Sequence, residues 1–386
     1  GNYMFSENQE GTSLERVTLS PNMTSFGTNT FANCTFLTTV NILGQEAVEG
    51  TAVLPEGLTT VPASLFSGTG IRKVVLPASV KSIGNSAFQN AYSLEEINLP
   101  EGLETIGSGV FWSTSIGETI QIPGTVTTIG GWVFQDCSNL KKVTFGEGSK
   151  LTEISSQLFL NSGLESIELP ETVTTIVGSA FKNTKITSID IPAAVTSIAS
   201  LGTTSSPFDS CVLLTAINVA PENTTYSSIN GILYNKDQTI LYLCPTANPG
   251  DENGSVTIPN TVETVTNMAF MENTGLEEII FAEGNTETEL LIGTSNGSTS
   301  SQVFGQMTGV KRIVFPERLV QLRNYTFYNS TGLEEVVLPT TLATLGTNVF
   351  RGCTSLTTVD WDGCQIKTTN TSLFQGATSL VNIVIP

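Results

Sequence analysis

Leu94-Glu-Glu-Ile-Asn-Leu-Pro100, followed by Leu103, Ile106 and Phe111, is the stretch that decides the fold of this chain. It is a short apolar strand pattern ending in proline, then a second apolar pair, then a phenylalanine. The same order returns at 333–350 and recurs along the chain about every 23 residues. A repeat of this length is typical of a solenoid, in which each unit packs against its neighbours. The sequence therefore predicts a stack of similar coils.

Two columns of residues mark where each coil turns. The first column consists of phenylalanines, at positions 31, 66, 88, 111, 134, 159, 181, 208, 270, 304, 327, 350 and 374. The residue three positions later is short in every coil but one: Cys34, Thr69, Ala91, Thr114, Cys137, Ser162, Thr184, Cys211, Asn273, Met307, Ser330, Cys353 and Ala377. A column of short side chains indicates a tight turn that packs closely against the coil below.

The strand pattern Leu-x-x-Ile-x-Leu predicts which side chains face the core. Side chains alternate along a strand, so the fourth and sixth positions share the buried face, and the third and fifth positions point outward. The following proline cannot donate to the sheet and therefore ends the pairing. The second segment, such as Val126-Thr-Thr-Ile129, should place two more apolar residues inward. We expect the phenylalanine segment to form a short helical turn on the outer side.

The chain is too long for one compact core, which stops growing near about 250–300 residues. A repeat array avoids that limit, so we expect a single solenoid over residues 1–386 with about 15 coils. Three stretches interrupt the repeat, and we interpret them as insertions near 43–52, 221–256 and 283–300.

The last two insertions differ in composition. The one near 221–256 holds apolar runs at 229–234 and 239–244, joined by Asn235-Lys-Asp-Gln238, which predicts a β-hairpin or an enlarged coil. The one near 283–300 is rich in Gly, Ser and Thr, which is typical of a mobile loop.

Charge and composition exclude several classes of function. A net charge of −19 argues against nucleic acid and anionic membranes as partners, because both require clustered Lys and Arg. No apolar stretch approaches the 18 residues that a membrane-spanning helix needs. The chain has no histidine, which removes Ser-His-Asp and Cys-His catalysis and the commonest zinc ligand. The sequence thus predicts no cofactor, no resident metal and no enzyme activity.

Six cysteines raise the question of disulfides. Cys34, Cys137, Cys211 and Cys353 share the short-residue column, and the nearest two, Cys137 and Cys211, lie about three coils apart, or roughly 15 Å at sheet spacing. A bridge needs Cα atoms within about 7 Å, so we predict buried free thiols. The alternative that stays open is a bridge between Cys353 and Cys364.

The fifth strand position identifies candidate binding residues on the outward face of the sheet. In the middle of the chain these residues are polar or acidic: Asn98, Gln121, Thr144, Glu168, Asp190 and Asn218. Glu168 and Asp190 should be neighbours about 5 Å apart, the separation of the carboxylates in a retaining glycosidase. An open sheet excludes little water, however, and offers no cleft. A cation held by side-chain oxygens and a solvated polar stripe are the other two interpretations.

Towards the C-terminus the same position becomes apolar, with Ile280, Val314 and Val337. β-Branched residues favour strands in any case, so ordinary strand propensity is one interpretation. The other is a patch for partner binding or self-association, because contiguous exposed apolar area tends to be functional. Trp112, next to a core phenylalanine, is a further candidate for stacking on a sugar.

The repeat resembles the BspA-like, or Treponema pallidum-type, bacterial leucine-rich repeat family. Val80-Lys-Ser-Ile-Gly-Asn-Ser-Ala-Phe88 carries the V-x-x-I-G…A-F pattern, Val173-Thr-Thr-Ile176 with Ala180-Phe181 is similar, and Asn230-Gly-Ile-Leu-Tyr-Asn235 resembles a longer variant. The resemblance covers roughly 14–386. It implies an α/β solenoid, a right-handed leucine-rich repeat with a parallel inner sheet, mostly strands and turns with short helical segments. It also implies a bacterial cell-surface or secreted protein with no catalytic motif, some of whose relatives bind host matrix proteins or other cells.

These observations lead to three functional hypotheses. The first is a cell-surface or secreted adhesion module that recognises a protein or glycan through its repeat surface. The second is a non-catalytic spacer, or stalk, within a larger surface protein. The third, a glycosidase using Glu168 and Asp190, is disfavoured by the open sheet. Gly1 is interpreted as a scar of tag removal, with the export signal deleted.

The last coil is expected to be open. Leu380-Val-Asn-Ile-Val-Ile-Pro386 begins a new coil and stops at its proline. Leu380, Ile383 and Ile385 would then have nothing stacked above them, and a free sheet edge invites pairing. Either the natural chain continues, or two molecules associate weakly end to end.

Overall fold

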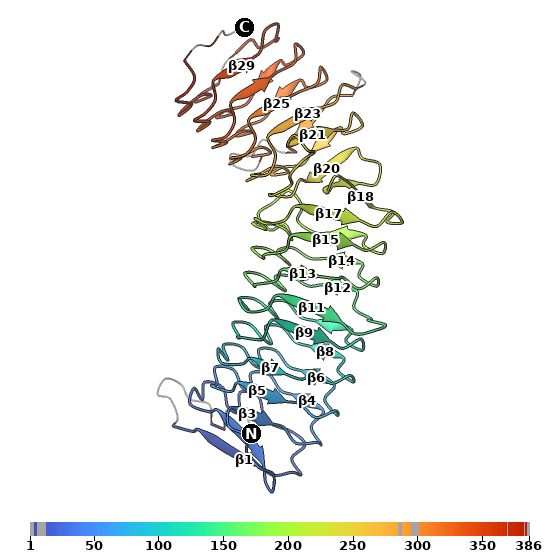
Figure 1. The fold of residues 1–386 in the computed structure, drawn as a ribbon, viewed down its shortest axis with the longest axis vertical. Helices are drawn as coiled ribbons and strands as arrows, with labels where there is room; N and C mark the ends of the chain where they lie inside the picture. The colour runs from blue at the N-terminus through green and yellow to red at the C-terminus, as the bar shows by residue number, and fades with distance from the viewer. Residues whose placement is uncertain are drawn as a thin grey trace. The chain divides into compact units, whose positions relative to one another are not determined.

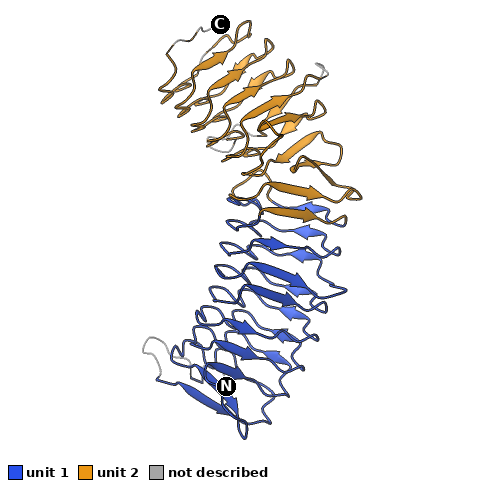
Figure 2. Ribbon diagram, in the orientation of Figure 1, with its two compact units in different colours: residues 1–186, 194–199, 205–211 blue, residues 187–193, 200–204, 212–386 orange. Residues whose placement is uncertain are grey.

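The computed structural model describes residues 4–5, 13–284, 288–294, 301–368, 370–381 and 383. It is a parallel β-solenoid of about 15 turns, which confirms the leucine-rich repeat fold class. The chain divides into two compact units, formed by residues 1–186, 194–199 and 205–211, and by residues 187–193, 200–204 and 212–386 (Figure 2). We call them unit 1 and unit 2.

The coils of unit 1 form two columns of parallel strands (Figure 1). The first column comprises β1 (Arg16–Leu19), β2 (Thr39–Ile42), β3 (Thr51–Val53), β5 (Lys73–Val75) and β7 (Glu96–Ile97), then β9 (Thr119–Ile122), β11 (Lys142–Phe145) and β13 (Ser166–Ile167). The second column comprises β4 (Thr60–Val61), β6 (Ser82–Ile83), β8 (Thr105–Ile106) and β10 (Thr128–Ile129), then β12 (Glu153–Ile154), β14 (Thr175–Ile176) and β16 (Ser197–Ile198). The V-x-x-I segment is thus itself a strand.

Unit 2 repeats both columns and adds antiparallel strands. Its first column comprises β15 (Ser188–Ile191) paired with β17 (Ala216–Val219), and β21 (Ser255–Ile258), β23 (Glu278–Phe281), β25 (Arg312–Val314), β27 (Glu335–Val337) and β29 (Thr358–Asp360) in one sheet. Its second column comprises β20 (Ile240–Leu243), β22 (Thr264–Val265), β24 (Leu291–Ile292), β26 (Gln321–Leu322) and β28 (Thr344–Leu345), extended by β18 (Tyr226–Ile229) and β19 (Ile232–Asn235).

The stretch near 221–256 folds as a three-stranded antiparallel element. β19 pairs with β20, which is the hairpin that the sequence suggested, and β18 pairs with β19 through Asn230 and Gly231. Both turn residues have positive φ, 51° and 77°. An Asn-Gly pair with these angles is favoured in two-residue hairpin turns because its twist matches that of the strands. The run at 229–234 is therefore two strands rather than one.

The phenylalanine column forms a continuous stack in the core of each unit. From Phe31 to Phe208, neighbouring ring centroids of unit 1 lie 5.5–6.1 Å apart, and from Phe270 to Phe374 those of unit 2 lie 5.1–5.3 Å apart. The rings are close to parallel, at most 26° apart in unit 2. Each ring thus fills the space between two coils, as the periodicity predicts.

The short helical segments are absent from the described residues, and this prediction was wrong. Ser86 and Asn90, two positions before and after Phe88, have φ of 55° and 58°, in the left-handed region. The amides of Ser86, Phe88 and Asn90 then donate to carbonyls of the following coil, at 2.8, 3.0 and 2.8 Å. A helix would need these amides for bonds within its own segment. Alternating conformation instead produces a ladder between coils.

The six cysteines are free and buried, as predicted, with no bridge between Cys353 and Cys364. Thiols in the short-residue column also form hydrogen bonds between coils. Cys137 Sγ donates to the carbonyl of Phe111 at 3.0 Å, and Cys353 Sγ donates to that of Phe327 at 3.1 Å. Burial raises the pKa of Cys137 to about 11 and that of Cys353 to about 12, because a buried thiolate loses its hydration.

Candidate functional site

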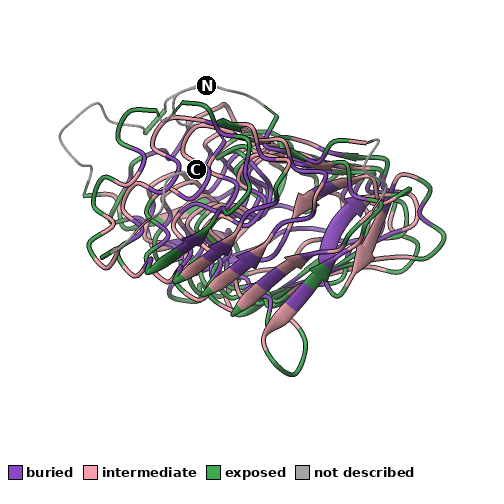
Figure 3. Ribbon diagram, turned by 90° about the horizontal axis from the view of Figure 1, so that it is seen from above, coloured by how far each residue is buried: buried purple, intermediate pink, exposed green. Residues whose placement is uncertain are grey.

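The outward rows of the first strand column are the surface on which the candidate residues lie. Along these strands, buried and more exposed residues alternate (Figure 3). In unit 1, Asn98, Gln121 and Glu168 are exposed and Thr144 is partly exposed. Gln121 and Thr144 face each other directly, in register between β9 and β11. The polar row of unit 1 therefore points to solvent.

Asn98 has a structural task that sequence reasoning missed. Its Oδ1 accepts from the amide of Leu76 and its Nδ2 donates to the carbonyl of Leu76, both at 2.8 Å. The backbone pairing of β5 with β7 ends one residue earlier, at Ile97. The side-chain amide thus continues the backbone ladder by one rung. Asn98 positions the strand ends, and Gln121 is the freer of the two amides.

A hollow of about 410 Å³ lies between the ends of β11 and β13 in unit 1. Here Phe145-Gly-Glu-Gly148 replaces the usual Leu-Pro, and Gly148 turns with φ of 66°. The longer turn leaves a depression beside Thr144, Glu168 and Glu171. A smaller hollow of about 240 Å³ lies beside Asn98, Glu101 and Gln121. The missing Leu-Pro was a readable signal for the larger depression.

Glu168 and Asp190 lie in different units, so the expectation that they are neighbours stays a prediction. Glu168 belongs to unit 1, where β13 pairs with β11, and Asp190 belongs to unit 2, where β15 pairs with β17. Asp190 faces Asn218, whose Nδ2 donates to Asp190 Oδ1 at 2.9 Å. Within the described ranges no three Asp, Glu or Cys side chains gather as metal ligands.

Unit 2 carries a different row at the same strand position. Thr257, Ile280, Val314, Val337 and Asp360 follow one another in register across β21, β23, β25, β27 and β29. Ile280, Val314 and Val337 are each partly exposed. We call these three the apolar row. Because parallel strands lie about 4.8 Å apart, the row spans about 10 Å.

Ion pairs run beside the apolar row, at the third and second strand positions. Arg312 bridges two carboxylates, with Nη1 2.6 Å from Glu278 and Nε 2.7 Å from Glu335. Lys311 Nζ lies 2.8 Å from Glu277. Exposed pairs of this kind contribute little stability, about 0–1 kcal/mol each. Their main effect is to fix the side chains that border the row.

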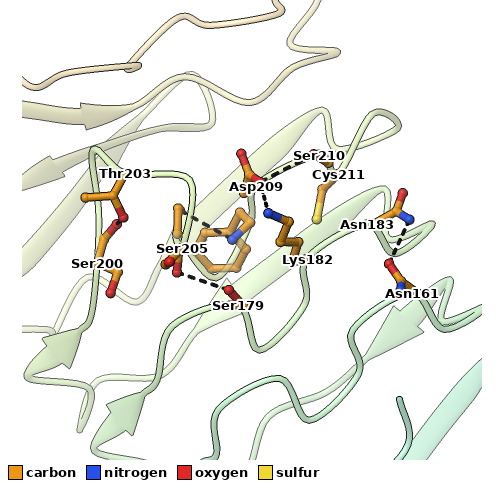
Figure 4. A network of polar contacts seen from close by, with 12 residues as sticks. Asn161, Ser179, Lys182, Asn183, Ser200, Thr203, Ser205, Asp209, Ser210 and Cys211 are labelled. Carbon is orange, nitrogen blue, oxygen red and sulfur yellow. Dashed lines mark hydrogen bonds and ion pairs between the residues drawn. The ribbon is translucent and has the colours of Figure 1, made fainter. Parts of the chain in front are cut away.

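Polar contacts also join neighbouring coils on the turn side of unit 1 (Figure 4). Asn183 Nδ2 donates to Asn161 Oδ1 at 2.9 Å, and Lys182 pairs with Asp209 at 2.8 Å. Trp112, the sugar-stacking candidate, is partly buried and donates its indole N–H to Asp136 at 2.9 Å. These groups hold one coil to the next, and Trp112 does not present a free indole N–H.

At the C-terminal side of unit 2, Leu380 and Ile383 are partly exposed, and Ile383 packs against the core cluster. A hollow of about 1110 Å³ lies there, lined in part by Trp361, Val381 and Ile383. Trp361 itself is buried, as its sixth strand position predicts. Ile385 lies outside the described residues, so the expectation of an open last coil stays a prediction. So does the expectation of a mobile loop near 283–300, much of which is likewise outside them.

Comparisons with known proteins agree with this architecture. The family described as BspA type leucine rich repeat region matches in six copies, over residues 1–141, 59–176, 139–235, 252–292 and 297–386. A search of curated proteins found no match. No helix in the described part of the chain is long and apolar enough to cross a membrane.

Three solved bacterial structures share the fold. A leucine rich cell surface protein from Faecalibacterium prausnitzii has a TM-score of 0.63 at 22% identity, covering 96% of this chain and 87% of that one. A leucine-rich repeat protein from Bacteroides ovatus has 0.56 at 18%, covering 93% of each chain. The pneumococcal vaccine antigen PcpA has 0.52 at 19%, covering 95% of this chain and 80% of that one.

Proposed function

Because this chain belongs to the BspA-type leucine-rich repeat family, we propose that it is a bacterial cell-surface or secreted binding module, without catalytic activity. It recognises a protein or glycan through the outward rows of its first strand column. The cell-surface description of the Faecalibacterium protein supports the proposed location. Adhesion to a host or to other microbes is the role that such a module would serve.

One observation carries the proposal: the apolar row of Ile280, Val314 and Val337. All three side chains are partly exposed on consecutive strands, although threonine at the same position, as at Thr257, suits a strand equally well. Contiguous exposed apolar area is uncommon on soluble monomers and tends to mark interaction sites. Strands in register hold these residues on a rigid lattice, so a partner meets a preformed surface with little entropic cost.

The same geometry disfavours catalysis by Glu168 and Asp190. Both side chains are exposed on an open sheet face, which excludes little water, and the chain has no histidine to assist them. The polar row that includes Asn98, Gln121, Thr144 and Glu168 is proposed as a further part of the recognition surface, with Asp190 and Asn218 serving in the same way in unit 2.

The test is a binding screen with a matched pair of variants. Wild-type protein is applied to arrays of matrix proteins and glycans, and each partner found is measured against Val314→Thr/Val337→Thr. The control is Val75→Thr, a single Val→Thr change at the same strand position in unit 1. We expect the double variant to lose the partner and the control to keep it. Equal capture by all three proteins would contradict recognition by the apolar row and leave the spacer hypothesis favoured.

A further inference from the structure

We infer that the apolar row binds a basic amphipathic helix of a partner protein, lying across strands β23, β25 and β27. The inference rests on the proposed function and names the class of partner. It follows from three properties of unit 2: the charges that flank the apolar row, the spacing of the residues in the row, and the ion pairs that the neighbouring lysine and arginine already form.

The flanking charge is acidic on both sides of the row. On the amino-terminal side, the second and third strand positions carry four carboxylates and two cations. Both of these cations, Lys311 and Arg312, are already paired with Glu277, Glu278 and Glu335. Beyond the carboxyl ends of β23 and β25 lie two more carboxylates, Glu283 and Glu317. These two are held by hydrogen bonds from the amide of Glu317 and the hydroxyl of Thr340, at 3.2 and 2.8 Å.

Six carboxylates, against the paired Lys311 and Arg312 and the buried Arg318 beside Glu317, leave a net acidic border around an apolar centre. A partner with acidic flanks would be repelled, and one with Lys or Arg on both flanks would be attracted. The third strand position lies about 7 Å from the fifth, along the strand. A helix is about 10–12 Å across with its side chains, so basic residues on its two sides reach these borders while its ridge rests on the row.

The spacing selects a helix rather than an extended segment. Ile280, Val314 and Val337 follow one another at the strand separation, about 4.8 Å. Apolar residues at i, i+3 or i+4, and i+7 of a helix advance by about 4.5–6 Å each and by about 10.5 Å in all. Alternate residues of an extended strand advance by about 6.6–6.8 Å and fall out of step with the row. A helical ridge therefore matches all three positions at once.

The experiment uses synthetic helices of about 18 residues, long enough to be helical in water. The first has a leucine ridge flanked on both sides by lysine. The second has glutamate in place of lysine, and the third has the composition of the first in an order without a ridge. Binding is measured by fluorescence anisotropy with the full chain, with Val314→Thr/Val337→Thr and with Val75→Thr.

We expect wild type and Val75→Thr to bind the lysine-flanked helix equally. The double variant should bind it at least about tenfold more weakly, because central apolar contacts contribute most of the binding energy of such interfaces. The glutamate-flanked and ridgeless peptides should bind more weakly by a similar factor, and added salt should weaken the first peptide. Equal binding of the ridged and ridgeless peptides, equal binding to wild type and the double variant, or no binding to wild type would each overturn the inference.

Two further outcomes separate this inference from the proposed function. If an array partner loses binding to the double variant while the lysine-flanked helix does not bind, the row is a binding site but its partner is not a basic helix. If sedimentation shows a wild-type dimer that the double variant abolishes, the occupant is a second copy of this chain, and the inference is likewise wrong.

Discussion

The fifth strand position looks quite different in the two units, although the strands around it are alike. From Asn98 to Glu168 in unit 1 it carries amides, a hydroxyl and a carboxylate, and from Ile280 to Val337 in unit 2 it carries the apolar row. Each unit also holds residues of the other kind, such as Val75 in unit 1 and Asp190 in unit 2. In both units the fourth position is buried or nearly so, and the phenylalanine stack continues beneath. The fold therefore does not dictate the fifth position. What varies between the units at this position is available for recognition.

The largest effect should come from the core that both units share. Phe134→Ala in unit 1 and Phe327→Ala in unit 2 each remove a fully buried ring from a stack. We expect each to lower the free energy of unfolding by about 3–5 kcal/mol, measured by chemical denaturation. The control Tyr92→Ala, at a 68% exposed side chain, should change it by less than about 0.5 kcal/mol. A large difference between the two variants in the lost free energy of unfolding would contradict a common core.

The next effect is a loss of stability at alkaline pH. Burial raises the pKa of Cys137 and Cys211 from 9.0 to about 11, so the unfolded chain releases these protons first. The contribution of these thiols to the free energy of unfolding is retained below pH 9. It falls as pH rises towards 11, by up to about 2–3 kcal/mol per thiol.

Burial raises the pKa of Cys353 in unit 2 to about 12, so this thiol should extend the loss of stability to higher pH. The measurement is denaturation at a series of pH values, with Cys137→Ala as the variant whose alkaline slope is shallower. Thiol titration should also find the native protein almost unreactive, with six groups released on unfolding. An unchanged slope in the variant would show that other groups control the alkaline loss.

A smaller effect should divide the polar row of unit 1 itself. Asn98→Ala removes two hydrogen bonds to Leu76 and should cost about 1–2 kcal/mol, because the Leu76 backbone groups lose partners. Gln121→Ala, one coil along, should cost less than about 0.5 kcal/mol. Thermal and denaturant unfolding of the pair would measure the difference. Equal costs would refute the structural task assigned to Asn98.

The smallest effect is expected for Glu168→Gln/Asp190→Asn. Both carboxylates are exposed, so the free energy of unfolding should change by less than about 0.5 kcal/mol while partner binding changes. Circular dichroism and calorimetry measure the first quantity, and the partner screen the second. Unfolding of the double variant would mean that these side chains are structural and that the outward assignment is incorrect.

Several features were predictable because they depend on residues repeated in every coil. The phenylalanine stack follows from thirteen rings at nearly constant spacing, and the free thiols follow from cysteines separated by whole coils. The facing of the strands follows from alternation alone. Each of these predictions averages over many coils, so a local irregularity does not disturb it.

Other features depend on single residues and escaped prediction. The left-handed φ of Ser86 and Asn90 is adopted by residues that also occur in helices, so nothing in A-F-x-x-C distinguishes a turn from a helix. The strands of the second column are only two residues long in most coils, which is too short to show a hydrophobic periodicity. The Asn230-Gly231 turn, by contrast, was readable from its sequence. The bonds of Asn98 depend on a neighbouring coil and had no local signal.

The hydrogen-bond ladder beside each phenylalanine also has an evolutionary consequence. The amides of Ser86, Phe88 and Asn90 bond to Ser108, Val110 and Trp112, one coil further along the chain. Most coils therefore present the same donors and acceptors to the coil that follows them. Duplicating or deleting a stretch of DNA that encodes a whole coil leaves this pattern intact, whereas a change of a few codons does not. Such a gene can lengthen or shorten by whole coils, with each new copy providing a fresh fifth strand position for selection.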